Sequence, residues 1–216
     1  MSTALMVSSG VLWTLTYVLI IRQSFRDHTY GMPLAALCAN LAWELIFSVV
    51  YLSVSRLQAG INIVWLLLDL VILVQVLRYG PREQRNVPLW AFFVGLTLGL
   101  ATAFAAVLLI TVEFHDWTGA YAAFSQNLMM SILFVAMLVR RNSLRGQGLG
   151  IAVSKLLGTA CATLAFVWYV PAFHGSVLLL FLGITTGVYD LLYVGLVYLL
   201  TRLPTLSAVF RTQQGS

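Results

Sequence analysis

Four ionisable side chains interrupt segments of this sequence that are otherwise almost wholly apolar: Glu44, Asp69, Lys155 and Asp190. Ionisable groups in a hydrocarbon layer are costly, and by default they mark a functional site. A carboxyl group in an apolar site resists ionisation and keeps its proton. Such a group can act as a general acid toward an alkene or an epoxide. The sequence therefore contains candidates for acid chemistry carried out away from water.

Aromatic and amide side chains accompany these acids, either directly beside them or at helical spacing, which puts them on or next to the same helix faces. Aromatic faces stabilise a carbocation by cation–π attraction, worth about 2 kcal/mol when desolvated. Excluded water cannot capture the cation early. The spacing predicts an apolar, aromatic-walled cavity that holds a few acids. The accompanying residues are Asn40 and Trp43 beside Glu44, Trp65 before Asp69, Tyr189 and Tyr193 around Asp190, and Asn127 in a further apolar run.

Each polar residue also has a purely structural interpretation. A carboxylate paired with Lys155 would hold helices together, and Asn40 and Asn127 would be hydrogen-bond partners between helices. Lys155 could pair with Glu44, with Asp190 or with neither. The sequence offers no ligand set for a metal, because its three histidines lie outside the apolar runs and no aspartate cluster could hold Mg²⁺. We therefore expect neither a metal nor a cofactor.

The elements that position these residues are predicted to be transmembrane helices. Of 216 residues, 61% are hydrophobic and only 9% are charged, whereas soluble domains carry about 25% charged residues. This composition excludes a soluble enzyme, and no basic face remains for nucleic acid. A helix that crosses a bilayer needs about 20 apolar residues. Seven such runs predict an all-α, single-domain bundle over 1–216, with spans near 4–21, 33–54, 61–78, 89–112, 120–139, 149–170 and 177–201.

The arginines predict the orientation of this bundle. Arginine-rich loops face the cytoplasm, and on the opposite side the sequence has only Arg56. We therefore expect the N-terminus outside, the C-terminus in the cytoplasm, and a cavity that opens laterally or toward the cytoplasm. The arginines on the predicted cytoplasmic side are Arg22, Arg26, Arg78, Arg82, Arg85, Arg140, Arg141, Arg145, Arg202 and Arg211.

The segment Asn40-Leu41-Ala42-Trp43-Glu44 resembles the N-x-x-W-E segment of the small integral-membrane terpene cyclases of fungal meroterpenoid and indole-diterpene biosynthesis. That family has bacterial relatives acting on farnesylated indole alkaloids of the drimentine type. The resemblance covers almost the whole chain. Further similar segments follow in order: Trp65 and Asp69; Asn127 to Ser131 with Phe134, Arg140 and Arg141; Gly146-Gln147; Lys155 to Thr159; and Asp190 to Tyr193.

The resemblance implies a seven-helix cyclase that starts carbocation cyclisation by protonating the distal end of a prenyl chain, without a metal or a cofactor. It implies Glu44 as the proton donor and Asp190 as a second acid, which orients the donor or replaces it. Cation-stabilising walls would be formed by Trp43, Trp65, Tyr189 and Tyr193, with Asn40, Asp69, Asn127 and Lys155 as supporting groups.

Short loops and an arginine-rich composition look more like an actinobacterial relative. That implies a farnesylated indole alkaloid as substrate and a bacterial cytoplasmic membrane as location. The expected partners are this amphiphilic substrate and the lipid bilayer, with no nucleic acid and no obligate protein partner.

Other functional classes fit the sequence less well. A proton-coupled transporter also suits acids at mid-membrane depth, but the inverted or parallel repeats common in such proteins are not found. A retinal protein needs a lysine in its last span, and the only lysine is Lys155 in the sixth. In a scaffold or receptor without chemistry, substitution of Glu44 or Asp190 would be silent. A metal-dependent terpene synthase would need the missing aspartate cluster.

Overall fold

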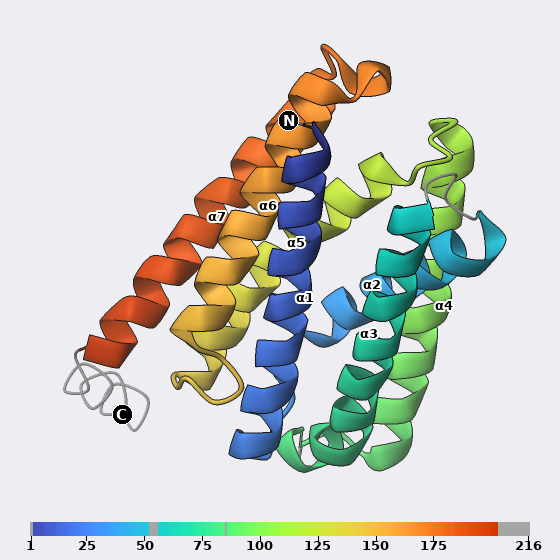
Figure 1. Ribbon diagram of the computed structural model, residues 1–216. Coiled ribbons are helices and arrows are strands. Elements are labelled where there is room, and N and C mark those ends of the chain that lie inside the picture. Colours follow the sequence, from blue (N-terminus) through green and yellow to red (C-terminus); the bar gives the residue numbers. More distant parts are fainter. Residues whose placement is uncertain (1, 52–55, 85, 203–216) are drawn as a thin grey trace.

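The computed structural model describes residues 2–51, 56–84 and 86–202, and within these ranges every regular element is a helix (Figure 1). This agrees with the all-α prediction. The helices are α1 (Ser2–Asp27), α2 (Leu34–Leu45), the π-helical turn η1 (Ile46–Val50), α3 (Arg56–Glu83), α4 (Leu89–Glu113), α5 (Ala120–Arg141), α6 (Leu149–Tyr169), the short 3₁₀ turn η2 (Pro171–Phe173) and α7 (Val177–Arg202).

Six of the seven predicted spans correspond to helices that are long and apolar enough to cross a membrane. The second, predicted over 33–54, is shorter in the described residues, where it comprises Leu34–Val50. Positions 52–54 of that prediction lie outside the described residues. Hydropathy counts apolar residues and does not report where a helix begins or ends, which explains the difference. The count of seven membrane crossings therefore stays a prediction, as does the orientation.

The limits of the second helix have local causes. Pro33 is extended (φ −58°, ψ 139°) and precedes the first helical residue. At the other end, the backbone N–H of Tyr51 donates to the carbonyl of Ile46, 2.8 Å away and five residues back. This wider hydrogen-bonding pattern makes the π-helical turn η1, and such turns are frequent at functional sites. The regular α-helix thus ends one residue after Glu44.

The helices form two groups that meet along α1 and α2. In the first group, α6 packs with α1 and α7, and α7 packs with α5; in the second, α3 and α4 pack with α2. Contacts of α1 with α3, of α2 with α5 and of α4 with α5 join the two groups (Figure 1). Helix α1 comes closest to α6, where the hydroxyl of Ser9 donates to the carbonyl of Gly158 at 2.9 Å. A Cβ at Gly158 would meet Trp13 at 2.9 Å. Small residues let membrane helices approach in this way.

The outer surface of the bundle is apolar. Side chains such as Trp90, Leu98 and Leu109 on α4 are more than 60% exposed. An exposed apolar surface of this extent is typical of contact with lipid. Together with the length and hydropathy of the helices, it indicates an integral membrane protein.

The two ends of the bundle differ in charge. The start of α1 and the end of α7 lie at opposite ends (Figure 1). At the end where α1, α3 and α5 finish, which we call the arginine end, Arg141 pairs with Glu83 at 2.8 Å and donates to the carbonyl of Tyr30 at 2.9 Å. The hydroxyl of Thr29 also donates to Glu83. These contacts tie the two helix groups together at the arginine end.

Candidate active site

A cavity of about 840 Å³ lies between the two helix groups. This volume falls within the range of small-molecule sites, which are typically apolar clefts with a few polar groups. Its walls come from α1, α2, η1, α3, α5, α6 and the connections beside them, and many of its side chains are aromatic. The aromatic lining residues are Trp13, Tyr17, Trp43, Phe47, Tyr51, Trp65, Trp117, Phe124, Phe166, Tyr169 and Phe173.

Glu44 is the carboxylic acid that lines this cavity among the described residues, and its side chain is only 2% exposed. The hydroxyl of Tyr17, on α1, donates to Glu44 Oε1 at 2.9 Å. Asn40, one turn before Glu44 on α2, donates from Nδ2 to the Tyr17 oxygen at 2.7 Å. This chain of two hydrogen bonds holds the carboxyl group in one orientation. The other oxygen, Oε2, receives no hydrogen bond from the described residues.

Asp69 lies behind Glu44, on the side away from the cavity. It is fully buried on α3, and its carboxyl group is within interaction range of that of Glu44. Asp69 is not among the residues that line the cavity. Two carboxyl groups thus lie together at one wall, where only Glu44 has access to a bound molecule.

The tryptophans of the wall are held by their indole N–H groups. Trp43 Nε1 donates to the carbonyl of Gly119 at 2.9 Å, and Trp65 Nε1 donates to Thr14 Oγ1 at 3.1 Å. Gly119 has φ +70°, and a Cβ there would lie 2.2 Å from the Phe47 ring, so the position requires glycine. With their polar edges occupied, Trp43 and Trp65 contribute apolar ring surface to the cavity.

A ladder of rings continues from Trp43 away from Glu44. Its ring centroids are 4.9 Å apart between Trp43 and Phe47, 6.2 Å between Phe47 and Tyr51, and 5.3 Å between Tyr51 and Trp117. On the opposite wall, Tyr17 lies 6.2 Å from Trp13 and 6.3 Å from Trp65. The negative faces of such rings attract a cation. The cavity can therefore stabilise positive charge along its length.

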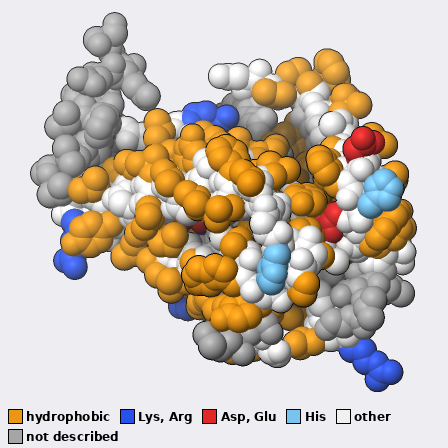
Figure 2. Space-filling model, turned by 90° about the horizontal axis from the view of Figure 1, so that it is seen from above, with side chains coloured by type: hydrophobic (Ala, Val, Ile, Leu, Met, Phe, Trp, Pro, Cys, Tyr) orange, Lys and Arg blue, Asp and Glu red, His pale blue; other side chains and the backbone are white. Residues whose placement is uncertain are grey.

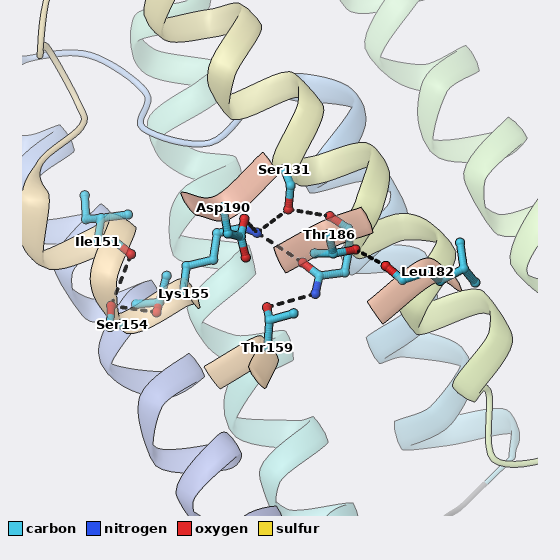
Figure 3. A network of polar contacts seen from close by, with 10 residues as sticks. Ser131, Ile151, Ser154, Lys155, Thr159, Leu182, Thr186 and Asp190 are labelled. Atoms are coloured by element: carbon cyan, nitrogen blue, oxygen red, sulfur yellow. Dashed lines mark hydrogen bonds and ion pairs between the residues drawn. The ribbon is translucent and has the colours of Figure 1, made fainter. Parts of the chain in front are cut away.

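Lys155 and Asp190 form a second polar cluster, between α5, α6 and α7 (Figure 3). Lys155 Nζ lies 2.6 Å from Asp190 Oδ1, and both side chains are almost fully buried. The same nitrogen donates to Ser131 Oγ at 2.5 Å and to Asn127 Oδ1 at 3.2 Å. All three ammonium hydrogens therefore have acceptors. The partner of Lys155, left open by the sequence, is Asp190.

This second cluster reaches the cavity only through its neighbours. Lys155 and Asp190 do not line the cavity, whereas Asn127 and Thr159 do. Asn127 accepts from Lys155 and donates from Nδ2 to Thr159 Oγ1 at 3.0 Å, so its amide orientation is fixed by the ion pair. Lys155 Nζ also lies 5.5 Å from the ring centroid of Trp13, which is a wall residue.

The remaining predicted residues, Tyr189 and Tyr193 on α7, lie outside the cavity wall. Tyr193 is fully buried and packs against Phe134 at 5.4 Å between ring centroids, while Tyr189 is half-buried. Helix α7 packs against α5 and α6 rather than against the cavity. The cavity wall thus includes Asn40, Trp43, Glu44, Trp65 and Asn127, but not Asp69, Lys155, Tyr189, Asp190 or Tyr193. The roles predicted for all ten stay predictions.

Tyr17 is one residue of this site that sequence reasoning missed. It lies in the first apolar run, which contains no ionisable group at mid-membrane depth, and so that run attracted no attention. A signal was present, since Trp13, Thr14 and Tyr17 all carry side chains that can hydrogen-bond. Tyr17 follows Trp13 by four residues and Thr14 by three, which puts them on neighbouring positions of one helix face. Phe166 and Trp117 were also missed as wall residues, because aromatic residues are common in membrane helices and tryptophan is common at the ends of membrane spans.

The mouth of the cavity lies at the end of the bundle opposite the arginine end. Its rim residues come from the start of α1, the start of α3, the α4–α5 connection and the end of α6 (Figure 1). Figure 2 looks onto this end, where hydrophobic side chains predominate. An opening toward the cytoplasm is therefore incompatible with the predicted orientation, because the arginines face the other way. Rim residues include Thr3, Met6, Leu57, Gln58, Trp117, Thr118 and Tyr169.

Among the described residues, no group of three or more His, Cys, Asp or Glu side chains could hold a metal ion. Both cysteines, Cys38 and Cys161, are free thiols in helices. The cavity wall places the buried carboxyl group of Glu44 beside aromatic rings.

Comparison with known proteins identifies the family. A family model described as Pyr4-like transmembrane terpene cyclases matches residues 1–203. The chain is 34% identical over 203 residues to the Pyr4-family terpene cyclase mfmH of Annulohypoxylon moriforme, covering 88% of this chain and 82% of that one. It is 32% identical to terpene cyclase penB of Penicillium crustosum and 29% identical to terpene cyclase pyr4 of Aspergillus fumigatus, each over 160 residues. The chain belongs to the Pyr4-like transmembrane terpene cyclases.

Coverage of the latter two relatives is smaller. The matches span 73% and 71% of this chain but 65% of each relative's own length, just under two thirds. All three relatives are fungal, so the expected bacterial branch and bacterial membrane receive no support.

Proposed function

We propose that this membrane protein cyclises the prenyl chain of an amphiphilic substrate, and that Glu44 starts the reaction by protonating the terminal alkene or epoxide. The observation that carries this proposal is the buried carboxyl of Glu44 at the wall of a large aromatic cavity, held by Tyr17 and unpaired with any base among the described residues. A carboxyl in such an apolar site retains its proton.

The proposed first step conserves atoms and charge. With an alkene, the O–H bond of Glu44 breaks while the π electrons of the terminal double bond form a new C–H bond, which leaves a tertiary carbocation and a carboxylate. With an epoxide, the proton goes to the epoxide oxygen and a C–O bond breaks, which leaves a hydroxyl group, a tertiary carbocation and the same carboxylate. The next double bonds of the chain attack this cation in turn and close the rings. Transfer of a proton from the last cation back to the Glu44 carboxylate, directly or through solvent, restores the acid and completes an isomerisation, so that product and substrate have equal mass. No metal takes part in this scheme.

Tyr17 and the aromatic wall have separate parts in the proposal. The Tyr17 hydroxyl stabilises the charge that develops on Glu44 Oε1, because a hydrogen bond to a carboxylate is stronger than one to the neutral acid. Trp43, Trp65 and Trp13 would face the migrating cation. Stabilisation by preorganised groups of this kind is often the largest contribution to catalysis.

For Asp190, we propose a role in positioning the cavity wall rather than that of an alternative proton donor. Asp190 is paired with Lys155 and does not line the cavity. We propose that it keeps Lys155 in place, and that Lys155 in turn fixes Asn127 at the cavity wall. Loss of Asp190 would then damage the site without removing the acid.

The expected substrate is a prenylated aromatic compound, with a farnesylated indole alkaloid as the first choice. The relatives are named terpene cyclases, which supports a terpenoid chain. A long apolar cavity with a rim that includes Gln58 and Thr118 suits a molecule whose chain extends to Glu44 while its polar head stays near the mouth.

The test uses membranes that contain the full chain. They are incubated with a farnesylated indole alkaloid and its terminal epoxide, with and without EDTA, and products are identified by mass spectrometry and NMR. We expect an isomer of unchanged mass with new rings, formed also in EDTA, and lost in Glu44→Gln. Glu113→Gln is the matched control, because it makes the same chemical change at an exposed residue at the end of α4.

Two outcomes would contradict the proposal. Full activity in Glu44→Gln would exclude Glu44 as the donor, and loss of activity in EDTA that Mg²⁺ restores would indicate metal-dependent chemistry. If no compound of the panel is converted, proton-coupled uptake of these compounds becomes the next measurement.

A further inference from the structure

The carboxyl group of Asp69 has an environment that a structural role does not explain. Asp69 is fully buried on α3, yet neither of its oxygens receives a hydrogen bond of regular geometry from the described residues. Leaving a buried polar atom without a partner is unfavourable, and leaving a buried charge without one is more so. Glu44 Oε2 is also without a donor. Two carboxyl groups without donors thus lie within interaction range of each other.

The surroundings of the pair contain no compensating charge in the described part of the chain. The four ion pairs found there involve Asp27, Glu83 and Asp190, but neither Glu44 nor Asp69. The polar neighbours are Tyr17 and Asn40, which are neutral; they are bonded to each other, and Asn40 also lies near Asp69. Two carboxylates at close range in an apolar site repel each other strongly, so they cannot both be ionised. A proton between the two groups would supply the missing hydrogen bond.

We propose that Asp69 keeps its own proton and donates a hydrogen bond to Glu44, so that the two residues act as a carboxyl pair. Asp69 is a positioning residue in this pair, since it lies outside the cavity wall and cannot touch a substrate there. This inference rests on the proposed function, because it assigns Asp69 its part in the same protonation step.

The role of Asp69 in that step follows from the direction of its hydrogen bond. When the O–H bond of Glu44 breaks and the new C–H bond forms, the negative charge stays on the Glu44 carboxylate. Two donors then face this carboxylate, the Tyr17 hydroxyl and the Asp69 O–H, and neither of their O–H bonds breaks. Because hydrogen bonds to a charged acceptor are stronger, both donors stabilise the transition state more than the resting acid.

The decisive variants are Asp69→Asn and Asp69→Leu, studied in the full chain in membranes. An asparagine amide still donates to Glu44, so we expect Asp69→Asn to keep most of the kcat. Leucine has similar volume but no donor, and we expect kcat to fall about 100-fold, as for loss of one oxyanion donor, with KM unchanged. Gln75→Leu removes another buried polar group from α3 and serves as control.

These kinetics exclude the competing roles. If Asp69 only supported the fold, both variants would lower the amount of folded protein or raise KM, and asparagine would not rescue kcat. If Asp69 were an ionised base, Asp69→Asn would lose as much kcat as Asp69→Leu. Either result would overturn the proposal.

A second measurement needs no substrate. Infrared absorption by protonated carboxyl groups, recorded on the protein in membranes, should lose one component in Asp69→Asn and another in Glu44→Gln. An unchanged spectrum in Asp69→Asn would show that Asp69 is ionised and would overturn this inference alone. An unchanged spectrum in Glu44→Gln would instead remove the proton donor of the proposed function. The two failures are therefore distinguishable.

Discussion

The Tyr17 hydroxyl donates a hydrogen bond of 2.9 Å to Glu44, and this bond joins α1 to α2 at the wall of the cavity. Tyr17 belongs to the helix group of α1 and Glu44 to that of α2, so the acid is oriented by a residue from the other group. Asn40 completes the arrangement by donating to the same hydroxyl at 2.7 Å. The position of the candidate proton donor therefore depends on how α1 and α2 sit against each other.

Tyr17→Phe removes this hydrogen bond and leaves the ring in place. We expect kcat to fall by about 10- to 100-fold, since one donor to the developing carboxylate is lost, while KM changes little. Steady-state kinetics in membranes measure both constants. Tyr79→Phe is the matched control, because Tyr79 is also buried but lies on α3 toward the arginine end. An unaltered kcat in Tyr17→Phe would mean that Glu44 does not need this bond.

Substitution at the Lys155–Asp190 pair should affect stability more than chemistry. Asp190→Leu leaves a buried ammonium group without its counter-ion, which costs about 3 to 5 kcal/mol. Lys155→Met alone should be similarly unfavourable, whereas the double variant should recover most of the lost stability. Thermal unfolding in detergent of the wild type, both single variants and the double variant gives the coupling energy. Simple additivity of the two single effects would show that the pair is not coupled.

Gly119→Ala should destabilise the protein and alter the cavity. Residue 119 has φ +70°, and the new Cβ would lie 2.2 Å from Phe47 and 2.7 Å from Trp43 Nε1. We expect a loss of about 1 to 3 kcal/mol and a changed product distribution, because Trp43 must shift. Gly95→Ala is the control, since a Cβ at Gly95 meets nothing within 4 Å. Equal stability of the two variants would contradict the close packing at Gly119.

Trp43→Leu should stop the series of ring closures before it is complete. Without the indole ring, the cation loses attraction and the wall admits water, so we expect partly cyclised products, some with the mass of one added water. Mass spectrometry of the product mixture measures their share. Trp168→Leu is the matched control because Trp168 is 63% exposed on α6 and does not line the cavity. Unchanged product identity in Trp43→Leu would remove Trp43 from the wall that guides the reaction.

The orientation can be tested by thiol labelling. In a Cys161→Ser background, Thr118→Cys lies at the rim of the mouth and Arg145→Cys lies at the arginine end, and both positions are exposed. A membrane-impermeant thiol reagent added to sealed vesicles of known sidedness should label one of them and not the other. The positive-inside rule predicts that Arg145→Cys is labelled from the cytoplasmic side. Labelling of Thr118→Cys from the cytoplasmic side would reverse the predicted orientation and place the mouth there.

Sequence reasoning was most accurate within single helices. The face that carries Asn40 and Glu44 was predicted from a spacing of four residues, and the structure has both at the cavity wall. Helical periodicity fixes such relationships without knowledge of the rest of the fold. Relationships between helices were harder to predict, because they depend on how each helix is rotated about its axis. The partner of Lys155 was therefore left open, and the contribution of Tyr17 was missed.

The rotation of α7 about its axis could not be predicted for the same reason. Periodicity put Asp190 and Tyr193 on one face, and both are indeed buried. That face packs against α5 and α6 instead of forming the cavity wall. Hydropathy also predicted seven apolar runs, but it could not report the π-helical turn that ends the second helix near Val50. Local backbone hydrogen bonds, rather than composition, determine that boundary.

The shortness of the second helix has a consequence for the surrounding lipid. From Leu34 to Val50 the segment is about 25 Å long at 1.5 Å per residue, less than the roughly 30 Å of a typical hydrocarbon core. A bilayer accommodates such a hydrophobic mismatch by thinning locally. The last turn of this segment leads to Tyr51 at the cavity wall, in line with Trp117 at the rim. The membrane is therefore expected to dip beside the mouth, which shortens the path of an amphiphile from the lipid to the acid.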